Sequence, residues 1–167
     1  MIQKKICMLG SFAVGKTSLI RRFVESIFSE TYHTTVGVKI DKKLLSVDGK
    51  ELNLVLWDLY GDDEFQKIRW SYCQGASGYL LVADGSRRAT FDKAILLQDR
   101  ARQEIGPVPF VFVLNKCDLV DEWEIDPEME ASLAAKNWTL LRSSAKTGQG
   151  VEEAFSQLAR KIIQLVG

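Results

Sequence analysis

Short apolar runs alternate along this chain with longer segments in which apolar residues recur at helical spacing. Strands are predicted at residues 2–9, 36–47, 51–57, 78–83, 109–115 and 139–142, and helices near 16–24, 63–73, 90–104, 127–136 and 151–165. The Asp48-Gly49 pair predicts a hairpin between the second and third strands, and therefore one antiparallel pair. The other strands are expected to be parallel and joined by right-handed crossovers. The pattern predicts an α/β fold with a six-stranded, mostly parallel sheet, one antiparallel strand and five flanking helices.

Composition narrows the class of protein. With 167 residues, 46% of them hydrophobic, and no linker, the chain is expected to form one domain around a single core. Lysine plus arginine equals aspartate plus glutamate at 22 each and no basic run stands out, so a nucleic-acid partner is not expected. The apolar runs are too short to cross a bilayer and no signal peptide is evident, so a cytoplasmic protein is expected. Cys7, Cys73 and Cys117 lack metal-ligand spacing and are expected to be reduced and packed.

The segment Gly10-Ser11-Phe12-Ala13-Val14-Gly15-Lys16-Thr17 lies between an apolar strand and a helical pattern, which is the context of a phosphate-binding loop. A chance match in another strand-turn-helix connection is the alternative, and the visible strand and helix weigh against it. Glycines at both ends of the loop allow backbone N–H groups to approach phosphate oxygens. Lys16 is expected to reach the β and γ phosphates, and Thr17 to offer a hydroxyl to Mg²⁺. The predicted phosphate-binding residues are Phe12, Ala13, Val14, Gly15, Lys16, Thr17 and Ser18.

A second motif, Asn115-Lys116-Cys117-Asp118, closes a later apolar strand and is therefore expected at the same edge of the sheet. The Asp118 carboxylate could accept hydrogen bonds from both N1–H and the 2-amino group of guanine, whereas adenine offers no such pair of donors. Lys116 could lie along the purine face, Asn115 could join this loop to the phosphate loop, and the Ala145 N–H could donate to guanine O6. The tetrapeptide alone is usually a solvated loop, so the argument depends on its position after a phosphate loop. The predicted base-binding residues are Asn115, Lys116, Asp118, Leu119, Ser144, Ala145 and Lys146.

With both motifs in this order, the chain resembles the Ras superfamily of small GTPases from Lys5 to the C-terminal helix. Among its branches it most resembles the Rab group, on the segments Thr35-Val36-Gly37-Val38, Trp57-Asp58 and Tyr72-Cys73-Gln74-Gly75-Ala76. The resemblance implies a single P-loop NTPase (G) domain over residues 1–167. It also implies a molecular switch that binds GTP or GDP with Mg²⁺.

The resemblance further implies roles for individual residues. Thr35 would complete the Mg²⁺ ligands with Thr17, Asp58 would hold a metal-bound water, and Gly61 would donate its N–H to the γ phosphate. Phe28 would pack against guanine and Tyr32 would cover the phosphates. Simpler alternatives are that Phe28 is a core residue and that Tyr32, like the single histidine His33, is a solvated loop residue.

The family also implies protein partners. Ile40, Trp57 and Tyr72 match the hydrophobic triad of Rab effector surfaces, in which the first member is usually Phe, so an effector patch of altered shape is expected. Trp57 could instead be only a buried strand aromatic. An exchange factor and an activating protein are the other partners that the family implies.

The catalytic positions depart from the family pattern, which reads Asp-Thr-Ala-Gly-Gln-Glu where this chain has Asp58-Leu59-Tyr60-Gly61-Asp62-Asp63-Glu64. Asp62 replaces the glutamine that orients the attacking water, and an ionised aspartate only accepts hydrogen bonds and adds negative charge beside the γ phosphate. Phe12 occupies the place of Gly or Ser, where a partner's arginine finger would enter, and Tyr60 replaces a small alanine. Slow hydrolysis is therefore expected, at or below about 10⁻⁴ s⁻¹. The catalytic positions in question are Lys16, Thr35, Gly61 and Asp62.

Two other functions remain open from the sequence. One is a scaffold that holds GTP or GDP without cycling, and the other is an ATPase with the same phosphate loop, which would leave Asp118 idle. The chain ends in Leu165-Val166-Gly167 without a cysteine that could be prenylated, so no lipid anchor is expected in this chain. Two explanations stay open: a longer tail follows these residues, or the protein works without a lipid and reaches membranes through a partner.

Overall fold

The computed structural model describes residues 2–25, 38–59 and 68–166, and every structural statement below concerns these residues. They form six strands, four α-helices and two short 3₁₀ helices. In chain order the elements are β1 (Ile2–Gly10), α1 (Lys16–Glu25), β2 (Val38–Val47), β3 (Lys50–Leu59), η1 (Trp70–Cys73), β4 (Gly78–Asp84), α2 (Arg88–Ile105), β5 (Phe110–Asn115), η2 (Val120–Glu122), α3 (Pro127–Ala134), β6 (Leu140–Arg142) and α4 (Val151–Val166).

The strands make one sheet in the order β2-β3-β1-β4-β5-β6. The β2–β3 pair is antiparallel, and the β1–β3, β1–β4, β4–β5 and β5–β6 pairs are parallel. Asp48 and Gly49 connect the antiparallel pair with φ angles of 50° and 79°, the positive values that a type I′ hairpin turn requires. The prediction of a mostly parallel sheet with one antiparallel strand is confirmed.

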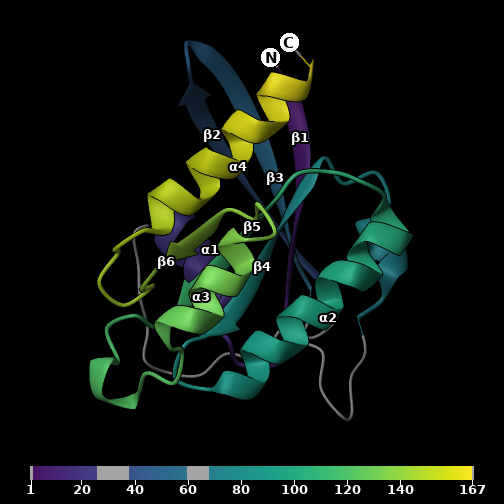
Figure 1. Cartoon of the computed structure of the whole chain (residues 1–167). Helices are drawn as coiled ribbons and strands as arrows, with labels where there is room; N and C mark the ends of the chain where they lie inside the picture. Colours follow the sequence, from purple (N-terminus) through teal and green to yellow (C-terminus); the bar gives the residue numbers. More distant parts are fainter. Residues whose placement is uncertain (1, 26–37, 60–67, 167) are drawn as a thin grey trace.

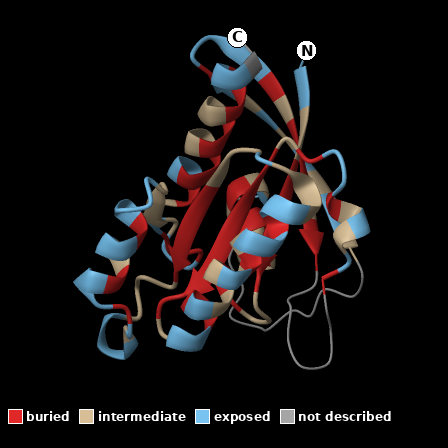
Figure 2. Cartoon of the chain, turned by 45° about the vertical axis from the view of Figure 1, so that its right-hand side comes forward, coloured by how far each residue is buried: buried red, intermediate tan, exposed pale blue. Residues whose placement is uncertain are grey.

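Helices cover both faces of this sheet (Figure 1). One hydrophobic core lies under α1 and α4, and a second lies under α2 and α3. Successive side chains of a strand point to opposite faces, so in β1 Met8 joins the first core and Cys7 joins the second. Figure 2 shows the strands as the buried centre of the molecule, with exposed residues on the outer surfaces of the helices. Burial on both faces explains why the central strands are nearly continuous apolar runs.

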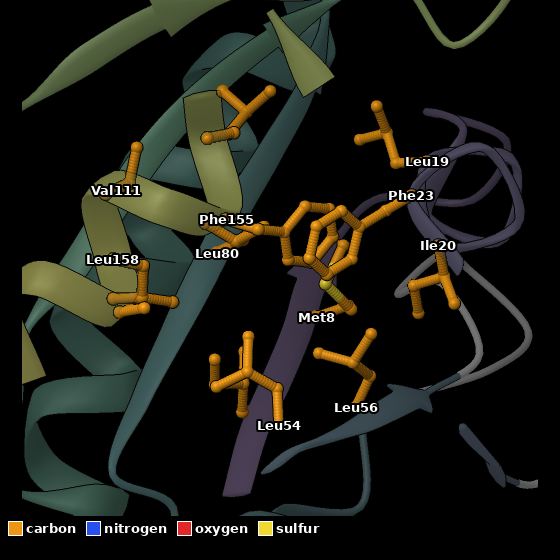
Figure 3. Close-up of a cluster of buried hydrophobic side chains, with 14 of the residues drawn as sticks. Met8, Leu19, Ile20, Phe23, Leu54, Leu56, Leu80, Val111, Phe155 and Leu158 are labelled. Atoms are coloured by element: carbon orange, nitrogen blue, oxygen red, sulfur yellow. The ribbon is translucent and has the colours of Figure 1, made fainter. Parts of the chain in front are cut away.

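An aromatic pair holds α1 against α4. The rings of Phe23 and Phe155 stack with centroids 4.1 Å apart and 4° between their planes. Figure 3 shows this pair above the strand residues Met8, Leu54 and Leu56. Because α1 begins where the phosphate loop ends, this packing also positions one end of the loop.

The predicted number of helices was wrong for the described part of the chain, which has four α-helices rather than five. The expected helix at 63–73 falls partly on residues 60–67, which lie outside the described residues, and its last part is the 3₁₀ turn Trp70–Cys73. The turn ends there because Gln74 is extended and Gly75 has a φ of 78°. The first two residues of the strand expected at 36–47 also lie outside the described residues, and β2 begins at Val38.

The three cysteines are free thiols, with Cys7 and Cys73 buried and Cys117 partly exposed. Cys7 and Cys73 lie together although β1 and η1 are distant in sequence. A hydrogen bond with Cys73, together with burial, raises the pKa of Cys7 far above its ordinary value, so this thiol is neutral. Among the described residues, no helix is both long and apolar enough to span a bilayer.

Candidate functional site

The loop between β1 and α1 is described completely, and its backbone fits closely against two neighbouring strands. A Cβ at Gly10 would overlap the carbonyl oxygen of Val82 on β4, and a Cβ at Gly15 would overlap Nδ2 of Asn115 at the end of β5. Gly15 also has a φ of 102°, which favours glycine. Glycine is required at these two positions by packing against β4 and β5, in addition to the approach of a phosphate that the sequence predicts.

Lys16 lies under this loop and is only 6% exposed. Its Nζ lies 3.5 Å from the carbonyl oxygen of Gly10 and 3.4 Å from that of Ser11. These are long contacts that a stronger acceptor could replace. The ammonium group is thus held at the start of α1, where the positive end of the helix dipole also lies.

Thr17 and Asp58 bring two oxygen groups together at the first turn of α1. The Thr17 hydroxyl donates to Oδ2 of Asp58 at 2.5 Å, and the Asp58 side chain is 1% exposed. Asp58 reaches this position because β3 pairs in parallel with β1, which sets Asp58 opposite Met8. A hydroxyl and a carboxylate are ligand types that Mg²⁺ accepts, so the donor set fits this ion.

Asn115, the last residue of β5, joins its own loop to the phosphate loop and to the loop at 143–146. Its Nδ2 donates to the carbonyl oxygen of Val14 at 2.9 Å, and its Oδ1 accepts from the Ser143 hydroxyl at 3.1 Å and from the Ala145 N–H at 3.3 Å. The Asn115 side chain is 1% exposed. The structure therefore brings the two motifs together. The Ala145 N–H, for which donation to guanine O6 is expected, donates to Asn115 in this structure.

The neighbouring residues of the second motif are held in a similar way. Lys116 has a φ of 67°, and its Nζ donates to the carbonyl oxygen of Ala13 at 3.1 Å. The Asp118 carboxylate accepts from the Ser144 hydroxyl at 2.7 Å, and that hydroxyl also accepts from the Thr147 N–H at 3.1 Å. Asp118 is thus fixed at the same sheet edge as the phosphate loop.

A sequence profile described as Ras family matches residues 5–164. The chain belongs to the Ras family. Its fold is the α/β fold of P-loop GTPases, and membership indicates a small GTPase that binds guanine nucleotides. The phosphate loop and the base motif both lie within the matched range.

Three residues at this Ras-family site were missed by sequence reasoning. The first is Arg22 of α1, which donates from Nε to the carbonyl oxygen of Ala145 at 2.7 Å and from Nη2 to that of Lys146. The others are Asp84 at the end of β4 and Arg87 just before α2. Asp84 could have been suspected, because it ends a strand at the edge where ligands bind. No local pattern marks the two arginines.

Asp84 is 1% exposed and lies among several donors. Burial alone would raise its pKa, but hydrogen bonds from Ser86 and the ammonium of Lys116 outweigh this effect and hold the pKa below its ordinary value. Asp84 is therefore ionised at neutral pH.

Several predicted site residues lie outside the described residues. They are Phe28, Tyr32, Thr35, Gly61 and Asp62, together with His33 and Tyr60. Among the remaining predicted residues, Ser18 is partly exposed in the first turn of α1, Leu119 is partly exposed after the base motif, and Lys146 is exposed.

The three residues of the expected effector patch lie close together on one face of the sheet. Ile40 on β2 is 46% exposed and lies opposite Trp57 on β3. The rings of Trp57 and Tyr72 have centroids 6.4 Å apart, and Lys5 Nζ lies 3.7 Å from the centroid of the Trp57 ring. Trp57 is partly exposed and also packs against the second hydrophobic core.

Proposed function

We propose that this Ras-family protein is a guanine-nucleotide switch of the Ras/Rab type that binds GTP and GDP with Mg²⁺ and hydrolyses GTP slowly. The observation that carries the proposal is the side chain of Asn115. It bonds to the phosphate loop at Val14 and to the 143–146 loop at Ser143 and Ala145. A ligand with phosphates at one end and a purine base at the other would lie across these segments.

The base half of the site favours guanine. Asp118 is held by Ser144, and a carboxylate at this place can accept from N1–H and the 2-amino group together. An ATPase would make no use of this carboxylate. Asp118→Ala should therefore abolish the preference for GDP over ADP, measured as the ratio of their dissociation constants. A preference that survives this substitution would contradict the assignment.

Thr17 and Asp58 would hold the Mg²⁺ ion, directly or through a bound water, and Thr35 would complete the set as the family resemblance implies. A bound ion would neutralise charge on the β and γ phosphates. The chain's own part is to hold Thr17 at the helix start with the Asp58 side chain beside it.

Slow hydrolysis is proposed from the identity of two residues, Phe12 and Asp62. The single-turnover rate of phosphate release from protein loaded with GTP should be at or below about 10⁻⁴ s⁻¹, near the value for unaided Ras. Completion within minutes would show that another group orients the attacking water.

The first test is the nucleotide that copurifies with the protein, identified by denaturation and ion-exchange chromatography. GDP would support a cycling enzyme and GTP a stalled one. The dissociation constants of fluorescent GDP and GTP should be micromolar or lower with Mg²⁺ present. Weaker binding of both nucleotides would overturn the proposal.

The second candidate function is a scaffold that keeps one nucleotide without cycling, and the same two residues, Phe12 and Asp62, favour it. A switch must bind its effectors with different affinity in its two nucleotide states. We propose Ile40, Trp57 and Tyr72 as the effector surface, because they are adjacent and partly exposed. Proteins captured from a lysate in equal amounts by the GDP and GTP-analogue forms, and lost on Trp57→Ala, would favour the scaffold.

A further inference from the structure

Asp84 and Arg87 lie outside both nucleotide motifs, yet they contact the phosphate loop through a chain of charged groups. The Asp84 Oδ1 atom accepts from the Ser86 N–H at 2.9 Å and from the Ser86 hydroxyl at 2.6 Å. Its Oδ2 atom accepts from Arg87 Nε at 3.0 Å and from Lys116 Nζ at 2.9 Å. One buried carboxylate thus holds two cations.

Each of these cations continues to a different peptide of the phosphate loop. Arg87 Nη2 donates to the carbonyl oxygen of Phe12 at 2.9 Å, and Lys116 Nζ donates to that of Ala13 at 3.1 Å. Asn115 binds the next carbonyl, that of Val14. Three consecutive carbonyl groups are therefore held from outside the loop, each by a different side chain.

This arrangement fixes where the loop's N–H groups point. In a trans peptide the carbonyl and the N–H of the same unit point in opposite directions. Holding the carbonyls of Phe12, Ala13 and Val14 outward therefore turns the N–H groups of Ala13, Val14 and Gly15 toward the other side, where a phosphate would bind. Ala13 needs such support, because its φ of 64° is costly for a residue with a side chain.

We propose that Arg87 is a positioning residue that, together with Asp84, keeps the phosphate loop in its nucleotide-binding shape and so slows the release of GDP and GTP. This inference rests on the proposed function. Lys116 and Asn115 belong to the base-binding motif at 115–118, whereas Arg87 belongs to neither nucleotide motif. Arg87 also places a positive charge beside a loop that binds an anion, and this attraction also slows the release of the nucleotide.

The test compares the release of fluorescent GDP from the full chain with Mg²⁺ present. Arg87→Ala should release GDP about tenfold faster, because the hydrogen bond to the Phe12 carbonyl, the ion pair with Asp84 and one positive charge beside the loop are lost. Arg87→Lys should recover part of this loss, since an ammonium can reach one of the two partner oxygens. Arg88→Ala is the matched control, because Arg88 is exposed and, within the described residues, contacts another segment through its backbone N–H to Glu124.

A second readout separates positioning of the phosphate loop from general loosening of the site. Inosine diphosphate lacks the 2-amino group of guanine, so the ratio of its release rate to that of GDP reports on Asp118. Arg87→Ala should leave this ratio unchanged, whereas a loosened site would lower it. Unchanged circular dichroism and melting temperature of the nucleotide-free variants would establish that they fold.

Equal GDP release from Arg87→Ala and Arg88→Ala would overturn the inference while leaving the proposed function intact. Unchanged release combined with slower single-turnover hydrolysis would also overturn it, because Arg87 would then act on the reaction rather than on the loop. Failure of the unsubstituted protein to bind GDP would instead overturn the proposed function.

Discussion

Replacing Asn115 by alanine should weaken the connection between the phosphate loop and the two base-binding loops at 115–118 and 143–146. The substitution removes hydrogen bonds to Val14, Ser143 and Ala145, all of which are buried. Three neutral hydrogen bonds at about 1 kcal/mol each give a loss of about 3 kcal/mol in the free energy of unfolding, and unpaired buried groups would raise this to about 5 kcal/mol. Nucleotide binding needs the loops at their native separation, so a share of at least about 1.4 kcal/mol should appear as a tenfold weaker GDP affinity.

The assay is urea unfolding in the absence of nucleotide, together with the dissociation constant of fluorescent GDP. Asn53→Ala on β3 is the matched control, because Asn53 lies near the start of its strand and far along the sheet from Asp58 at the site. The control should change both quantities by less than about 0.5 kcal/mol. A loss below about 1 kcal/mol for Asn115→Ala in both measurements would refute the conclusion that this side chain joins the loops.

Three other predictions concern stability and catalysis. The pKa of Asp84 is held below its ordinary value near 3.8, so its charged form stabilises the fold above that pH and the stabilisation is lost as the pH falls through the lower folded value. The difference in urea-unfolding free energy between the protein and Asp84→Asn should therefore be constant above about pH 5 and shrink at lower pH; a difference that grows there would contradict the sign of the shift. Asp62→Gln alone should raise the single-turnover hydrolysis rate only in part, and Asp62→Gln with Phe12→Gly should raise it further; full recovery from the single change would refute the steric role of Phe12. Phe23→Ala should lower the unfolding free energy by about 3–5 kcal/mol, because Phe155 loses its stacking partner, and a loss under 1 kcal/mol in urea would argue against this packing.

The sheet and most helices could be predicted because their signals are local. Central strands such as β4 and β5 are buried on both faces and therefore appear as apolar runs, and the Asp48-Gly49 turn supplies the positive φ angles of the hairpin. The expected helix at 63–73 failed in its described part, because Arg69 is extended and only the single 3₁₀ turn Trp70–Cys73 follows it. Apolar spacing alone does not distinguish a short turn from a full helical segment.

The residues of the site also divide into those that a local sequence motif marks and those that it does not. The glycines of the phosphate loop, the carboxylate of Asp118 and the amide of Asn115 could be assigned from the sequence, because each motif is contiguous and its chemistry follows from the residue types. Arg22 and Arg87 could not be assigned. They contact carbonyl groups 123 and 75 residues away in the chain, and a backbone carbonyl carries no signal in the sequence.

The sequence by itself therefore determined the class of fold, the order of the two motifs and the substitutions at the catalytic positions, since each is written in consecutive residues. Only the tertiary structure decided how the loops are held. The parallel sheet sets the ends of β1, β3, β4 and β5 at one edge, and there Asp84 gathers two cations and directs them to neighbouring peptides of the phosphate loop. Such contacts depend on distances in space, which chain separation does not predict.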